Sequence, residues 1–101
     1  MPPPALKKNN DMKEDLSVTE SVSRYKECVF KSARTFAKSK ETAPIVAKAS
    51  IANCPTARQQ VVATYKASLN RSSREGRLFI LNIDKRVQSL AELEVVRLRS
   101  K

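Results

Sequence analysis

Residues 17–38, which read SVTESVSRYKECVFKSARTFAK, decide the fold. Their apolar residues recur at steps of three and four, as Val18, Val22, Tyr25, Val29, Ala33 and Phe36. This spacing places them along one face of an α-helix, with charged residues on the opposite face. Ser17 and Glu20 have the spacing of a capping box, so the helix is predicted to begin at Ser17.

A second helical pattern follows a short connector. Pro44 suits the first turn of a helix, because its missing N–H would be unpaired there in any case. The apolar stripe keeps one phase through Pro55 and comprises Ala47, Ile51, Cys54, Arg58, Val61, Val62, Tyr65 and Leu69. A proline inside a helix removes a backbone hydrogen bond, so we predict either a kink near residues 53–55 or two helices nearly in line. Arg58, the charged member, either extends its guanidinium to solvent or forms an ion pair.

A last helix is predicted from a second capping box, formed by Ser72 and Glu75. Its main stripe comprises Phe79, Ile80, Ile83, Val87, Leu90, Ala91 and Leu98, and this stripe is expected to pack on the preceding helices. Four apolar residues fall outside the stripe: Leu78, Leu81, Leu93 and Val96. They are interpreted as an interaction surface for a second copy or another protein, against the alternative of scattered exposed side chains on a monomer. The runs 78–81 and 95–99 leave a small β-hairpin as an alternative to helix.

These patterns predict an all-α fold. It consists of a helical hairpin, whose second helix is kinked near Pro55, and a C-terminal helix, with three to four helices in all. Residues 1–15 contain three consecutive prolines and mostly polar side chains, a composition typical of a disordered arm. Residues 16–101 are then a single helical domain, since a chain of 101 residues has room for one core.

The composition bears on function. Histidine is absent and glycine occurs once, which removes His general bases, imidazole metal ligands and Gly-rich phosphate loops. We therefore expect no enzyme activity, no catalytic residue, no metal or cofactor and no small-molecule substrate. The net charge of +10 favours a polyanion as partner. Candidate anion-binding residues are Arg24, Lys31, Arg34 and Lys38 on the first helix and Arg71, Arg74 and Arg77 near the start of the last.

The two cysteines, Cys28 and Cys54, lie at similar distances on either side of the connector near residues 39–43. An antiparallel pairing of the two helices would bring them together. A disulfide would add about 3 to 4 kcal/mol to the stability of the domain. The alternatives are two reduced core thiols, a metal site completed by a second chain, and a catalytic cysteine, for which no histidine partner exists.

Three segments, YKECV at 25–29, SKETAPIV at 39–46 and AKASIANC at 47–54, resemble small, mostly uncharacterised exported two-cysteine helical proteins of bacteria. The likeness covers residues 22–65. It implies a disulfide and an envelope location, and it implies no activity. Because the first residues lack the apolar stretch of a signal peptide, we expect a periplasmic or secreted location if a signal precedes this chain and a cytoplasmic one otherwise.

The expected function is that of a non-enzymatic basic helical protein of the bacterial envelope that binds a protein or an anionic surface. The alternative is a cytosolic nucleic-acid-binding protein that uses its basic helical faces. No transmembrane segment is expected, since no run of about 20 apolar residues occurs.

Overall fold

The computed structural model describes the backbone of residues 2–100 and the side chains of residues 18–100. The helices are α1 (Pro2–Phe36), α2 (Ala43–Ala52), α3 (Pro55–Ser68) and α4 (Ser73–Arg99). Residues 2–100 contain no strand, so the all-α prediction is confirmed and the β-hairpin alternative is wrong. Residues 78–81 and 95–99 are helical because they continue the buried stripe of α4.

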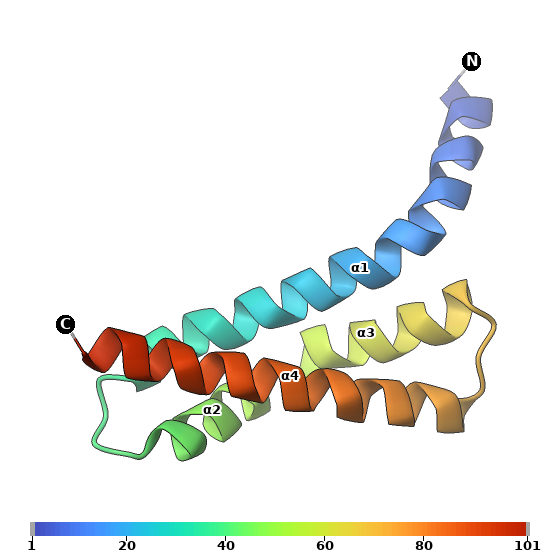
Figure 1. Ribbon diagram of the computed structural model, residues 1–101. Helices are drawn as coiled ribbons and strands as arrows, with labels where there is room; N and C mark the ends of the chain where they lie inside the picture. Colours follow the sequence, from blue (N-terminus) through green and yellow to red (C-terminus); the bar gives the residue numbers. More distant parts are fainter. Residues whose placement is uncertain (1, 101) are drawn as a thin grey trace.

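The four helices form three rods (Figure 1). The chain runs along α1, returns through α2 and α3, which follow one another, and then runs back along α4. Helix α1 packs on α2, α3 and α4, and α4 packs on both α2 and α3. The long helices α1 and α4 therefore both pack on the rod formed by α2 and α3.

The second rod is broken at Asn53 and Cys54, which separate α2 from α3. The N–H of Asn53 donates to the carbonyl of Ala49 at 3.0 Å and ends α2. Pro55 is the first residue of α3, where its missing N–H needs no partner. Of the two predicted forms, the chain adopts two separate helices.

The beginning of α1 differs from the prediction. The capping box predicted a helix start at Ser17, but α1 begins at Pro2 and Ser17 lies within it. A capping-box pattern marks an end only where the backbone before it leaves the helix. The disordered arm predicted at residues 1–15 falls outside the residues whose side chains the structure describes.

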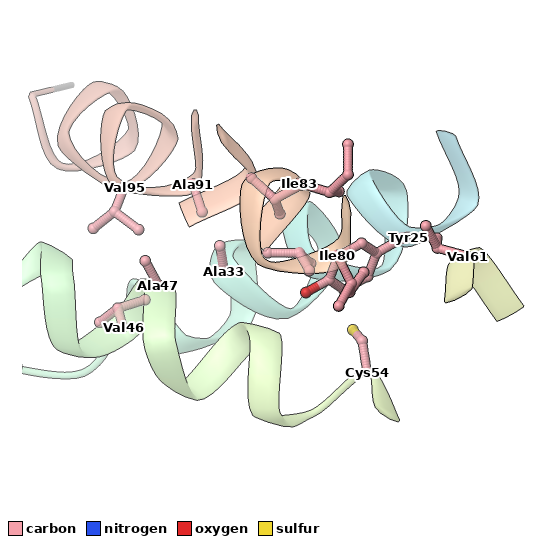
Figure 2. Close-up of a cluster of buried hydrophobic side chains, with 12 residues drawn as sticks. Tyr25, Ala33, Val46, Ala47, Cys54, Val61, Ile80, Ile83, Ala91 and Val95 are labelled. Carbon is pink, nitrogen blue, oxygen red and sulfur yellow. The ribbon is translucent and has the colours of Figure 1, made fainter. Parts of the chain in front are cut away.

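The core is built mainly from small apolar side chains. Figure 2 shows Val46 and Ala47 of α2 opposite Ala91 and Val95 of α4, all fully buried or nearly so. Small side chains allow the helices to approach closely. At the single glycine, Gly76 of α4, a Cβ atom would lie 2.9 Å from the Cγ atom of Lys66 of α3.

Two residues of the predicted stripes lie outside this core. Leu90 is 41% exposed, because it lies at the edge of the buried face of α4, away from Val87 and Ala91. Leu69 is 42% exposed because it follows the last residue of α3, where the helix ends. The predicted positions of these two side chains in the core are therefore wrong.

Candidate binding surfaces

Cys28 of α1 and Cys54 form a disulfide, and their Cα atoms are 6.2 Å apart. The predicted pairing is confirmed at the level of geometry. The break between α2 and α3 positions Cys54, since Cys54 is the N-cap residue of α3 and lies beside the C-terminal half of α1. Asn53 Nδ2 donates to Ser32 Oγ at 3.0 Å, and Ser32 Oγ lies 3.9 Å from Cys54 Sγ. Polar contacts from Ser32 of α1 and from Asn53, between α2 and α3, thus lie beside the disulfide.

A charged cluster joins α1, α3 and α4 beside the core. Asp84 of α4 accepts a hydrogen bond from the Tyr25 hydroxyl at 2.6 Å. Arg58 of α3 donates to both carboxylate oxygens of Asp84, with Nη2 2.7 Å from Oδ2 and Nε 3.1 Å from Oδ1. Of the two alternatives for Arg58, the ion pair is therefore the correct one.

Tyr25 is fully buried, and this determines its chemistry. Burial raises the pKa of the Tyr25 hydroxyl far above its ordinary value, and the hydrogen bond to Asp84 raises it further. The same carboxylate raises the pKa of Arg58. Tyr25 is therefore a neutral donor and Arg58 a fixed cation, an arrangement that holds three helices together.

The four residues of the predicted basic face are exposed, with Arg24, Lys31 and Arg34 on α1. Lys38, predicted on the same helix, lies instead in the turn that follows it, because α1 ends at Phe36. Two of these cations have acidic neighbours. Arg24 lies 2.7 Å from Glu20 on the same helix, and Arg34 lies 3.4 Å from Glu94 of α4. Exposed pairs of this kind are weak and compete poorly with an added polyanion.

The second basic group, Arg71, Arg74 and Arg77, is exposed around the turn between α3 and α4. Asn70 begins the turn with a positive φ of 51°, a conformation that asparagine tolerates better than most residues. Arg71 lies 3.1 Å from Glu75.

The structure does not join the two basic groups into one site. Arg99 at the end of α4 donates to the carbonyl of Ser39 at 2.9 Å, so α4 spans from the second basic group to the turn that carries Lys38. A helix of 27 residues is about 40 Å long. The candidate anion-binding residues are therefore distributed along the molecule.

The third surface is the outer face of α4, which we define as Leu78, Leu81, Lys85, Ser89, Leu93 and Val96. Its four apolar members are the predicted interaction residues, and they are 54%, 47%, 66% and 53% exposed in chain order. Five of the seven large exposed apolar side chains in the described part of the chain lie on α4, the fifth being Leu90. Exposed apolar surface is thus concentrated on one helix.

Sequence reasoning missed Asp84, Ser32 and Asn53. A signal existed for Asp84, since it lies four residues after Ile80 and three before Val87, on the buried side of α4. An acidic residue at such a position needs a cationic partner, and Arg58 is the cation on the neighbouring stripe. Ser32 and Asn53 carry no comparable signal, because serine and asparagine are common on solvated surfaces.

Comparison of the chain with protein-family models, with curated proteins and with solved structures gave no match. Within the described residues, no helix is long and apolar enough to span a membrane. The same residues contain no cluster of three or more cysteine, aspartate or glutamate side chains suited to holding a metal ion.

Proposed function

We propose that this chain is a non-enzymatic binding protein of the bacterial envelope whose exposed cations hold it on an extended anionic surface. The distribution of the two basic groups over about 40 Å carries the proposal. A small anion needs several donors that converge on one point, whereas a polyanion meets separate cations along its length. The net charge of +10 acts in the same direction.

The disulfide supports the envelope location. Disulfides persist in oxidising compartments such as the bacterial periplasm and are rare in the cytosol. The resemblance to exported two-cysteine proteins points the same way. The intact mass of the protein isolated from its cells, with free thiols blocked at lysis, tests this: a bridged protein lacks two hydrogens, and a fully alkylated one contradicts the location.

The alternative, a nucleic-acid-binding protein, finds less support in the aromatic residues. Single strands are usually held by bases that stack on exposed aromatic rings among cations. Tyr25 is buried, and Tyr65 stacks on Phe79 with ring centroids 4.0 Å apart. Those rings have little free surface for a base. Phosphate contacts to a duplex remain as an outcome of the experiment.

Binding to vesicles of phosphatidylglycerol, to heparin and to a short DNA duplex at several salt concentrations tests the proposal. We expect binding to the vesicles and to heparin that weakens as salt rises, and no binding to phosphatidylcholine vesicles. Binding to the duplex alone would establish the nucleic-acid alternative. Absence of binding at low salt, or binding independent of salt, contradicts the proposal.

A matched pair of variants tests the surface. Lys31→Gln/Lys38→Gln removes two exposed charges from the first basic group, and Lys48→Gln/Arg86→Gln removes two exposed charges from outside the basic groups. At about 1 kcal/mol for each cation near an anionic surface, the first variant should bind phosphatidylglycerol about 30-fold more weakly. An equal loss in the second variant would show that only net charge matters.

A further inference from the structure

The residues of the outer face of α4 have the same spacing, and the same order of apolar and polar members, when counted from either end of the face. Its members follow one another at steps of three, four, four, four and three, and the pattern is symmetric about the level of residue 87. Leu78 and Val96 are 18 residues apart, which is five helical turns, so they point in the same direction. Each end of the face carries two exposed apolar side chains, and Lys85 and Ser89 lie between them.

We infer that a second copy of this chain covers the outer face of α4, with the two α4 helices antiparallel across a twofold axis at the level of residue 87. In this register Leu78 faces Val96 of the second copy at the centre of the contact, and Leu81 comes level with Leu93 of the second copy at the opposite edge of the contact. Lys85 then faces Ser89 of the second copy, not another lysine. A twofold contact must be self-complementary, and in this register each apolar end of the face comes level with the apolar end of the second copy.

One oppositely charged pair beside the face favours the same arrangement. Glu92 of the second copy comes level with Asn82, three residues or about 4.5 Å along the helix from Lys85. Both lie on the same side of the contact, so two symmetric pairs of Lys85 with Glu92 form. Glu92 Oε2 accepts a hydrogen bond from Gln88 at 3.1 Å, which orients the carboxylate. An anionic lipid surface or an acidic peptide would instead meet Glu92 as a like charge.

The size of the contact sets its strength. The face extends over 18 residues, about 27 Å, and a helix with its side chains is about 10 Å wide. That footprint is about 270 Å² on each chain, below the roughly 800 Å² per partner of a standard specific interface, so the dimer forms with a dissociation constant on the order of micromolar or weaker. A twofold contact buries the same face on both chains and leaves no copy of that face exposed, so association stops at two chains.

Sedimentation equilibrium of the full, oxidised chain from about 5 to about 500 µM tests the inference. The average mass should rise with concentration from 11.3 kDa toward twice that value. Leu81→Glu and Leu93→Glu should stay monomeric, since each places a carboxylate within the apolar part of the contact. Ile45→Glu is the matched control, because Ile45 is 49% exposed on α2, away from the face, and this variant should associate like the parent. Far-UV circular dichroism verifies that each variant retains its helices.

Charge reversal tests the register. Lys85→Glu and Glu92→Lys should each weaken association on the order of tenfold, and the double exchange should restore it. Failure of the double exchange overturns the register. A monomer at every concentration, or equal effects of Leu81→Glu and Ile45→Glu, overturns the inference. A monomer whose binding to phosphatidylglycerol vesicles depends on Leu81 would identify a lipid surface as occupant instead. Because association is measured without a polyanion, its failure is distinguishable from failure of the proposed anion binding.

Discussion

A covalent bridge joins the C-terminal half of α1 to the residue that precedes α3, whereas α4 is held to these helices by side-chain contacts alone. The Cys28–Cys54 bridge lies at the break of the second rod, where the helical hydrogen bonds are interrupted. Asp84 fastens α4 instead, through Tyr25 of α1 and Arg58 of α3. This small core is therefore reinforced by a disulfide where the helical hydrogen bonds are interrupted and by a charged cluster where α4 packs on α1 and α3.

Removal of the bridge should have the largest effect. Cys28→Ser/Cys54→Ser, or reduction of the parent chain, should lower the free energy of unfolding by about 3.5 kcal/mol, because the bridge closes a loop with a sequence separation of 26. Urea denaturation with and without reductant measures it. The double serine variant is the control, since reductant should leave its stability unchanged. A loss under about 1 kcal/mol would show that side-chain contacts alone hold the second rod in place.

Removal of the charged cluster should have the second-largest effect on the free energy of unfolding. Asp84→Ala leaves the buried Tyr25 hydroxyl and the half-buried Arg58 guanidinium without their acceptor, and it should lower the free energy of unfolding by about 2 kcal/mol. Glu20→Ala, which breaks the exposed pair with Arg24, is the control and should change stability by less than about 0.5 kcal/mol. Equal losses of stability in the two variants would show that the charged cluster stabilises the fold no more than an exposed ion pair does.

Tyr25→Phe tests how much the Tyr25 hydroxyl contributes to the stability of the cluster and how that contribution depends on pH. Loss of one hydrogen bond should lower the free energy of unfolding by about 1 kcal/mol at neutral pH. The pKa of Tyr25 is raised in the folded state, so its contribution is complete below the ordinary value of 10.0 and is lost as the pH rises above it. The parent chain should lose stability above this pH, and Tyr25→Phe should lose less. Tyr65→Phe is the control, and a parent-like alkaline loss in Tyr25→Phe would contradict the assignment.

The smallest effect concerns the beginning of α4. The Ser72 hydroxyl accepts a hydrogen bond from the N–H of Glu75 at 3.1 Å, and the Glu75 carboxylate accepts one from the N–H of Ser72 at 3.0 Å. Ser72→Ala should lower the free energy of unfolding by about 1 kcal/mol and increase amide exchange in the first turn. Ser89→Ala, within the exposed face of the same helix, should leave stability nearly unchanged. Exchange unaffected at the first turn would show that packing alone holds this end.

The elements of the fold could be predicted because each depends on neighbours in sequence. The stripe from Val22 to Phe36, the interruption before Pro55 and the capping box at Ser72 are local patterns with local physical causes. The helix start at Ser17 could not be predicted, because a capping pattern specifies an end only if the preceding backbone departs from helix.

The candidate sites were less accessible to such reasoning. The exposure of Leu78, Leu81, Leu93 and Val96 followed from helical geometry, since they lie opposite the buried stripe. The pairing of Arg58 with Asp84 depends on which faces of α3 and α4 meet, which is a property of three-dimensional packing. The separation of the two basic groups could not be predicted either, because it depends on the path of α4 through the structure.

The bridge between Cys28 and Cys54 has a mechanical consequence. When the ends of an oxidised chain are pulled apart, force passes from one sulfur to the other, and the segment between the two cysteines, α2 included, carries no load. At about 3.5 Å for each residue, the sequence separation of 26 withholds about 90 Å of contour length until the bond is reduced. The oxidised protein is thus a shorter tether than its reduced form, with α2 shielded from tension.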